Sequence, residues 1–210
     1  LPAPPPLRPA AIEQAREAGA ILLDLRSPEA FAGAFIPGSL AIPADMLPGY
    51  GGFFLDADRD IVLIPESRAD VGQAIRHLVR MGFDRIAGYL DGGLHTWEVS
   101  GRAYDRIAAI HAEPMVERLR SDEPVTLLDV RKPTEWEQER LQGATHIFLG
   151  DLPDHIAELD PERPVITFCG SGRRAIIAAS ILKDHGFAHV ENGLGSVSAC
   201  ESIGCRIAKG

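Results

Sequence analysis

Short runs of apolar residues alternate with longer amphipathic segments along the whole chain. The helical patterns are clearest at 71–81 and 175–185. The apolar runs are typical of buried strands and fall at 21–25, 61–64, 86–89, 125–130, 165–168 and 189–190. Strands that alternate with helices within about 100 residues favour a mainly parallel sheet with helices on both faces. The pattern therefore predicts an α/β fold.

The same pattern occurs twice. Residues 21–28, Ile-Leu-Leu-Asp-Leu-Arg-Ser-Pro, return 105 positions later as Thr-Leu-Leu-Asp-Val-Arg-Lys-Pro. Gly38 recurs at that offset as Gly143, and Gly82-Phe83 recurs as Gly186-Phe187. Self-similarity at a fixed spacing predicts two copies of one fold. We assign a linker to 1–10, a first domain to 11–105 and a second domain to 106–210.

The linker assignment rests on composition. Five of the first nine residues are proline, which is typical of an extended connection to something upstream. A tag scar or a trimmed terminus explains the same residues nearly as well.

Composition bounds the function classes. The 210 residues are 45% hydrophobic and 24% charged, with a net charge of −9, as in ordinary soluble proteins. No basic stripe is available for nucleic acid or an anionic membrane, and no apolar stretch approaches the roughly 18 residues of a membrane span. With no signal peptide visible, we expect a cytoplasmic protein. Neither nucleic acid nor membrane is an expected partner.

The cysteines and histidines argue against a metal centre. Three cysteines are an odd, sparse set that suits a reducing compartment better than a disulfide framework. The seven histidines are scattered, without paired spacing. We predict no metal site and no cofactor.

The most informative motif is Cys169-Gly170-Ser171-Gly172-Arg173-Arg174. It follows the apolar run 165–168 and leads into the helical pattern 175–185, so the thiol is placed at a helix N-terminus. Helix N-termini and glycine-rich turns present backbone N–H groups that stabilise anions, including a thiolate. The motif therefore predicts a reactive cysteine in an oxyanion cradle made by the amides of Gly170 through Arg174. The plainer alternative is a small buried hydrophobe that ends a core strand.

The two other cysteines lie in a different setting. Cys200 and Cys205 fall in the last fifteen residues and lack a glycine- and arginine-rich loop. We interpret both as structural, with a resolving-thiol role for either left open.

These motifs resemble a rhodanese domain. In the second copy the resemblance rests on Leu127-Leu-Asp-Val-Arg131, Gly143-Ala144 and the Cys-x-x-x-x-Arg loop; in the first it rests on Leu22-Leu-Asp-Leu-Arg26, Phe35-Ile-Pro-Gly38 and the segment 88–97. The resemblance implies two rhodanese-like domains, each a mainly parallel sheet flanked by helices. It also implies sulfurtransferase chemistry, in which the loop cysteine takes a sulfane sulfur from thiosulfate or a low-molecular-weight persulfide and yields it to a thiol or cyanide acceptor.

The residue roles follow from that resemblance. Cys169 would be the nucleophile and carrier, Arg174 would be tied to loop carbonyls or turned towards the donor, and Arg173 would face solvent. Asp129 and Arg131 are interpreted as structural, one fixing backbone amides and the other forming an ion pair.

The two copies differ at the loop. Aligning 61–64 with 165–168 puts Pro65 opposite Cys169 and Asp70 opposite Arg174, so the first domain is predicted to be catalytically inactive. In the second copy, Glu139-Arg-Leu-Gln142 replaces the family's usual Gly-His-Ile-Pro, and Cys200 stands where the first copy has Trp97.

An inactive copy followed by an active one, behind a proline-rich leader, is also similar to the tail of fusions that begin with a metallo-β-lactamase-fold persulfide dioxygenase. Such an upstream domain is a predicted partner. Two other functions stay open: a non-catalytic regulatory or persulfide-carrier module, and a cysteine phosphatase or arsenate reductase. The last class uses five residues between cysteine and arginine, whereas here the residue at that spacing is Ala175.

Overall fold

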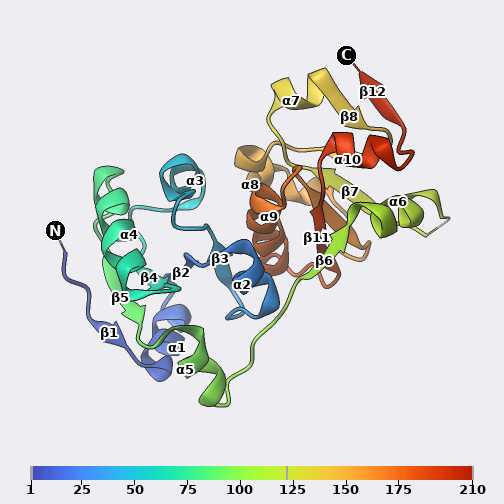
Figure 1. Cartoon of the computed structure of the whole chain (residues 1–210). Helices are drawn as coiled ribbons and strands as arrows, with labels where there is room; N and C mark the ends of the chain where they lie inside the picture. The colour runs from blue at the N-terminus through green and yellow to red at the C-terminus, as the bar shows by residue number, and fades with distance from the viewer. Residues whose placement is uncertain (1, 122, 210) are drawn as a thin grey trace. The chain divides into compact units, whose positions relative to one another are not determined.

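The computed structural model describes residues 2–121 and 123–209 and divides the chain into two compact units, 1–106 and 107–210 (Figure 1). Within the described residues, no helix is both long and apolar enough to cross a membrane.

The first unit is built on a five-stranded parallel sheet in the order β1-β5-β4-β2-β3. The strands are β1 (Pro6–Leu7), β2 (Ile21–Asp24), β3 (Ser39–Ala41), β4 (Ile61–Ile64) and β5 (Ile86–Leu90). The helices are α1 (Pro9–Glu17), α2 (Pro28–Gly33), α3 (Leu47–Phe54), α4 (Arg68–Arg80) and α5 (Gly93–Val99).

The second unit repeats this plan with a parallel sheet in the order β6-β11-β10-β7-β9. Its strands are β6 (Ala108–His111), β7 (Thr126–Asp129), β9 (Thr145–His146), β10 (Val165–Phe168) and β11 (Val190–Leu194). Its helices are α6 (Ala112–Arg120), α7 (Pro133–Gln138), α8 (Leu152–His155), α9 (Arg173–Asp184) and α10 (Val197–Ser202), with short 3₁₀ turns η1 (Leu149–Asp151) and η2 (Ile156–Glu158). The predicted α/β fold with helix-flanked parallel sheets is confirmed in both units.

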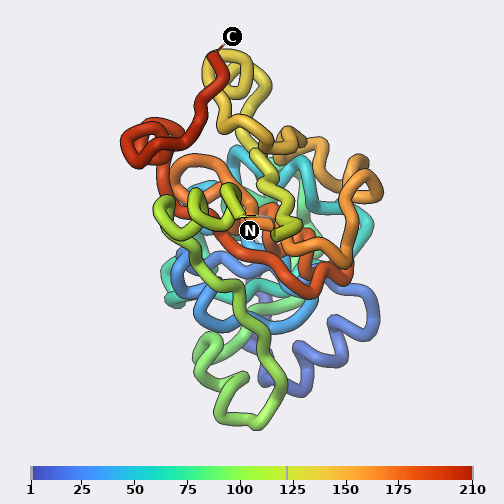
Figure 2. The backbone as a smooth tube through the Cα atoms, turned by 90° about the vertical axis from the view of Figure 1, so that its right-hand side faces the viewer, coloured from blue at the N-terminus to red at the C-terminus, as the bar shows by residue number. Residues whose placement is uncertain are grey.

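The second unit also contains a separate two-stranded antiparallel sheet. Strand β12 (Ile207–Lys209) pairs with β8 (Glu139–Leu141), and Figure 2 shows the red C-terminal end beside the yellow segment that carries α7 and β8. Neither strand is predicted from the sequence. Their mixed polar and apolar residues lack the long apolar run by which the buried strands were found.

The proline-rich start differs from the linker that its composition predicts. Residues 6 and 7 form the edge strand β1, which pairs with Tyr89 and Leu90, and Pro9 stands in the first turn of α1. The Tyr89 N–H donates to the Pro5 carbonyl at 3.1 Å and the Asp91 N–H donates to Leu7 at 3.0 Å. Proline is tolerated at a sheet edge because only its carbonyl has to pair.

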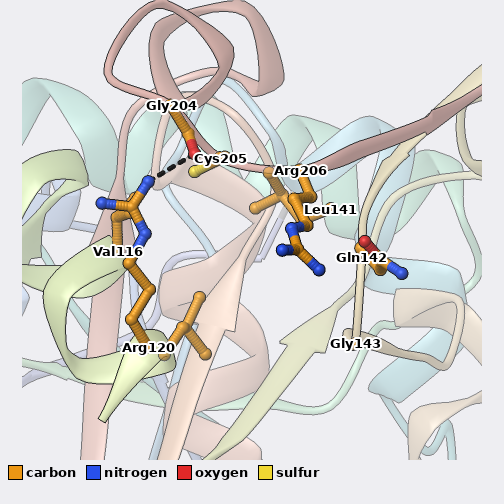
Figure 3. A pocket seen from close by; sticks show the side chains of 9 residues that line it. Val116, Arg120, Leu141, Gln142, Gly143, Gly204, Cys205 and Arg206 are labelled. Atoms are coloured by element: carbon orange, nitrogen blue, oxygen red, sulfur yellow. Dashed lines mark hydrogen bonds between the residues drawn. The ribbon is translucent and has the colours of Figure 1, made fainter.

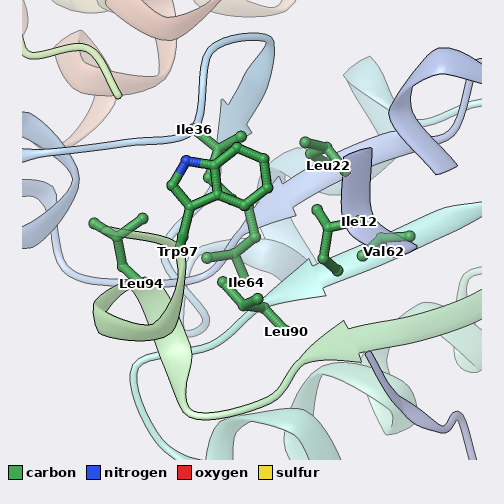
Figure 4. Close-up of a cluster of buried hydrophobic side chains, with 8 residues drawn as sticks. All are labelled: Ile12, Leu22, Ile36, Val62, Ile64, Leu90, Leu94 and Trp97. Atoms are coloured by element: carbon green, nitrogen blue, oxygen red, sulfur yellow. The ribbon is translucent and has the colours of Figure 1, made fainter. Parts of the chain in front are cut away.

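Each unit buries apolar side chains between its sheet and a pair of helices. In the first, α1 and α5 cover one face with the cluster drawn in Figure 4, Ile12, Leu22, Ile36, Val62, Ile64, Leu90, Leu94 and Trp97. In the second, α6 and α10 cover the equivalent face with Ile110, Met115, Leu127, Leu141, Ile166, Phe168, Val197 and Cys200. Trp97 and Cys200 thus take matching places, as their alignment predicts.

A buried ion pair lies at the end of one inner strand of each sheet, next to the central strand. Asp24 and Asp129 are fully buried at the ends of β2 and β7, and each binds the arginine two positions on, Arg26 or Arg131. The shortest N–O distances are 2.6 Å for the first pair and 2.7 Å for the second. Burial raises the pKa of Asp24, and the Arg26 guanidinium opposes that rise. Removing one member of such a pair is strongly destabilising, because it leaves an uncompensated buried charge.

We expect Asp24→Ala to lower the free energy of unfolding by about 3–5 kcal/mol, because Arg26 would be left buried without its counter-charge. The measurement is a urea titration of the full chain followed by circular dichroism, with each transition fitted separately. Asp58→Ala removes an exposed carboxylate from the same unit and should change stability by less than about 0.5 kcal/mol. Equal effects of the two substitutions would contradict the structural role of the pair.

Candidate functional site

Cys169 lies at the carboxyl edge of the second sheet, directly after β10. All four residues of β10 are buried, and the strand runs between β11 and β7. The chain then turns through 170–172 and enters α9 at Arg173. Parallel sheets place their ligand sites beyond the carboxyl ends of the strands. The predicted strand, loop and helix around Cys169 are confirmed.

Two glycines make the turn possible. Gly170 has φ +109° and Gly172 has φ +80°, in the region that L side chains rarely adopt. A Cβ on Gly172 would also lie 2.5 Å from Cδ2 of Leu194 and 3.2 Å from Nδ2 of Asn192. Glycine at 172 is therefore required both by the backbone and by the space beneath it.

The Cys169 sulfur faces the first turn of α9. The Ala175 N–H donates to Sγ at 3.3 Å. Only 3% of the Cys169 surface is exposed. The cradle predicted from the sequence comprises the amides of Gly170 through Arg174 and omits Ala175, whose amide comes within reach because α9 begins at Arg173. An amide dipole and a helix N-terminus at the same atom favour negative charge on the sulfur.

Arg174 is anchored to the loop and to the neighbouring helix α7. Its guanidinium donates to both carboxylate oxygens of Glu135, at 2.5 and 2.9 Å, and to the Cys169 carbonyl at 3.2 Å. The tie to a loop carbonyl is one of the two arrangements predicted for Arg174. Glu135 could not be predicted from the sequence, because it lies 39 positions before its partner Arg174 and on another element, α7.

The pair with Arg174 also shifts the ionisation of Glu135. Its hydrogen bonds to the Arg174 guanidinium hold the pKa of Glu135 below its ordinary value, against a smaller opposing effect of burial. The Lys132 N–H adds a further hydrogen bond to Glu135 at 3.1 Å. Glu135 is therefore a carboxylate at neutral pH and neutralises part of the Arg174 charge.

Ser171 and Arg173 are the exposed members of the loop. Arg173 is the first residue of α9, so its side chain leaves the cradle on the solvent side, as predicted.

Asp129 and Arg131 hold the adjacent strand end and have the structural roles predicted for them. The Arg131 N–H donates to Asp129 at 3.0 Å, and the Arg131 guanidinium reaches the Glu139 carbonyl at 2.8 Å, beyond α7. Arg131 thereby fixes the end of the helix that carries Glu135.

A cavity of about 400 Å³ lies along α7, the helix that carries Glu135. His146 stacks on Trp136 there, with ring centroids 4.8 Å apart, and its Nε2 lies 2.8 Å from the Arg131 carbonyl. The lining is Pro133, Trp136, Glu137, His146, Ile147, Phe148, Asp151, His155 and Glu158. Its three carboxylates make it an unfavourable place for an anion.

Within the described residues, no three or more histidine, cysteine or acidic side chains gather as metal ligands would. All three cysteines are free thiols.

Comparison with known proteins finds the same family in both units. Residues 9–100 and 112–202 each match the family described as Rhodanese-like domain. The chain is 32% identical over 121 residues to the putative sulfur carrier protein YrkF of Bacillus subtilis, and the match covers 58% of each protein. It is 31% identical over 90 residues to the putative sulfurtransferase YtwF of the same organism, covering 42% of this chain and 87% of that protein.

Among solved structures, thiosulfate sulfurtransferase of Pseudomonas aeruginosa aligns with 98% of this chain and 44% of its own length, at 22% identity and a TM-score of 0.44. The chain thus spans little more than half of YrkF and less than half of the Pseudomonas protein.

Gly172→Ala should destabilise the second unit by more than Gly186→Ala. Both glycines have φ near +80 to +90°, but a Cβ at 186 meets nothing within 4 Å, whereas one at 172 meets Leu194. The backbone cost of about 1–3 kcal/mol is shared, and only Gly172→Ala adds a clash. Thermal unfolding of both variants measures the difference. Equal losses would mean that the loop relaxes around the new methyl group.

Glu135→Gln should destabilise the second unit at pH 7, and the loss should vanish in acid. Because the pKa of Glu135 is lowered by folding, its contribution to stability is complete above its ordinary value of 4.5 and disappears as the pH falls through the folded-state pKa. Melting temperatures of the variant and parent, measured from pH 7 downwards, should converge. Glu137→Gln, on the exposed side of the same helix, is the control, and a gap for Glu135→Gln that does not depend on pH would contradict the ion pair.

Proposed function

The chain belongs to the rhodanese family, with two rhodanese-like domains in tandem, and on that premise we propose that its second domain transfers sulfane sulfur through a persulfide on Cys169. The observation that carries the proposal is the position of the Cys169 sulfur, which receives a backbone N–H at the N-terminus of α9.

The proposed chemistry needs a thiolate and no separate base. With thiosulfate as donor, the Cys169 thiolate attacks the outer sulfur, the new Cys169 S–S bond forms, and the donor S–S bond breaks as sulfite leaves with the electron pair. With a persulfide as donor, the same attack releases the donor thiol. A thiol or cyanide then attacks the terminal sulfur, and Cys169 leaves again as thiolate. Each step is a displacement at sulfur, whose rate depends on thiolate character and access.

The size of the loop supports sulfur rather than phosphate. Four residues separate Cys169 from Arg174, and Arg174 donates inward to the Cys169 carbonyl at 3.2 Å. The Arg174 guanidinium also donates to Glu135. Arg174 therefore holds the loop in position and is not available to bind a tetrahedral oxyanion. A single sulfur atom next to the amides needs fewer donors than the oxygens of a phosphoryl group.

The first domain is proposed to be inactive. Pro65 follows β4 at the place of Cys169 and supplies neither a nucleophile nor an N–H. Asp70, opposite Arg174, accepts hydrogen bonds from the Ser67 N–H at 2.7 Å and the Ser67 hydroxyl at 2.9 Å. The N-terminus of α4 is therefore already occupied by a carboxylate of the chain itself, in a capping box.

The identity of the sulfur donor is a separate part of the proposal. Thiosulfate and a low-molecular-weight persulfide both carry the sulfane sulfur and negative charge that the cradle fits. An upstream metallo-β-lactamase-fold domain that supplies persulfide remains a prediction from the sequence organisation. Comparing turnover with thiosulfate and cyanide against turnover with glutathione persulfide separates the two donors.

Cys169→Ser should reduce sulfur transfer to the uncatalysed rate with either donor, because a serine hydroxyl without a base neither attacks sulfur nor carries it. The assay is thiocyanate formation from thiosulfate and cyanide, repeated with glutathione persulfide and a thiol acceptor.

Cys200→Ala and Cys205→Ser are the matched controls and should keep most of the activity. Activity that survives in Cys169→Ser would contradict both the single-cysteine mechanism and the inactivity of the first domain. Faster hydrolysis of an aryl phosphate than transfer from any sulfane donor would favour the phosphatase alternative instead.

A further inference from the structure

A second cavity of the second unit lies away from the Cys169 loop, among α6, β8 and the segment that follows α10. Its volume is about 530 Å³. Among the described residues, the lining combines apolar side chains, two arginines and a thiol and includes no acidic residue: Val116, Leu119, Arg120, Leu141, Gln142, Gly143, Gly204, Cys205 and Arg206. Figure 3 shows the Arg120 guanidinium bonded to the Gly204 carbonyl, beside the sulfur of Cys205.

The turn that ends α10 brings Cys205 against Cys200. The Cys205 N–H donates to the Cys200 carbonyl at 2.9 Å, the Gly204 N–H donates to Glu201 at 3.0 Å, and Gly204 has φ +88°. These are the two hydrogen bonds and the left-handed glycine of a Schellman motif, which places the first and last side chains of the turn in contact. The two thiols are joined by a side-chain hydrogen bond.

The same motif ends α4 and α9, where it serves packing alone. There the N–H of Phe83 donates to Leu78, and that of Phe187 donates to Leu182. The residues in contact are leucine and phenylalanine in both cases. At α10 both positions are cysteines, so the motif holds a dithiol where its counterparts hold a hydrophobic pair.

The first unit shows how this space is filled when no thiol is present. Trp97 stands four positions before Gly101, as Cys200 does before Gly204, and it is 1% exposed. Its indole N–H donates to the Ala103 carbonyl at 2.9 Å. Replacing an indole by a thiol at the matching place leaves volume beside α10, and Cys205 lines the cavity there.

We propose that Cys205 is a thiolation site for small anionic disulfides, and that Cys200 resolves the adduct into a Cys200–Cys205 disulfide. In the first step the Cys205 thiolate attacks one sulfur of the disulfide, forming a mixed disulfide and releasing one thiolate. In the second, Cys200 loses its proton and attacks the Cys205 sulfur, and the second small thiolate leaves and takes up a proton. The small disulfide is reduced to two thiols, and the cysteine pair is oxidised.

The environments of the two thiols assign the order of attack. Cys200 is completely buried, and burial raises its pKa to about 12. Burial also raises the pKa of Cys205, but the hydrogen bond from Cys200 and the Arg120 charge oppose that rise. Cys205 lines the cavity, and Arg120 and Arg206 attract the carboxylates of an incoming disulfide. The accessible, cation-flanked thiol reacts first, and the enclosed one resolves.

The test treats the full chain with glutathione disulfide at pH 8, blocks remaining thiols and maps the peptides by mass spectrometry. In the parent chain we expect a Cys200–Cys205 disulfide with no retained glutathione. In Cys200→Ala the reaction should stop at glutathione on Cys205, and in Cys205→Ser no adduct should form on Cys200. Arg206→Gln should slow the first step several-fold, whereas Cys169→Ser should leave the disulfide yield unchanged.

Three results would overturn the proposal: no modification of either cysteine, glutathione that stays on Cys205 although Cys200 is present, or an adduct on Cys200 in Cys205→Ser. The parent chain alone decides the first two, so a variant that fails to fold does not block the test. The sulfur-transfer assay of Cys169 is separate, and its failure would leave this result standing.

Discussion

A buried carboxylate bound to a buried guanidinium fixes the carboxyl edge of the second sheet, and the rest of the site depends on it. Asp129 ends β7, and Arg131 joins it to the Glu139 carbonyl beyond α7. This hydrogen bond ties the C-terminal end of α7 to the end of β7. Glu135 on α7 accepts hydrogen bonds from Arg174, and Arg174 also donates to the Cys169 carbonyl. The position of the sulfur is thus determined through a chain of charge-assisted hydrogen bonds that begins one strand away.

The carboxyl edge of the sheet can be compared between the two units, because only the second has a cysteine directly after its central strand. Both keep the buried ion pair, so it is a requirement of the fold and not of the chemistry. They differ in what stands at the next helix N-terminus. In the first unit, the Asp70 carboxylate caps α4. In the second, Gly172 caps α9 with no side chain, and the Cys169 sulfur takes the amide of Ala175. A helix N-terminus that carries its own carboxylate has little affinity left for another anion.

The features that depend on local or periodic patterns could be predicted from the sequence. The apolar runs located the central strands, the repeat located the two units, and the glycines and arginines after Cys169 located the loop. What it did not reveal depends on pairing between distant segments. Glu135 meets Arg174 across 39 residues, and β12 meets β8 across a longer stretch. The composition of the first residues predicts a linker and not the edge strand β1, because proline is rare in strands, although at a sheet edge only its carbonyl has to pair.

The three cysteines of the second domain have different burial and different electrostatic surroundings. Cys169 is as buried as many structural cysteines, yet its sulfur meets a backbone N–H at a helix N-terminus. Cys200 is buried among apolar side chains, and that burial raises its pKa to about 12. Cys205 lies between these extremes, partly exposed and close to the charge of Arg120. Burial alone therefore does not determine how reactive a thiol is, because the oriented dipoles and charges around the sulfur also affect the stability of the thiolate.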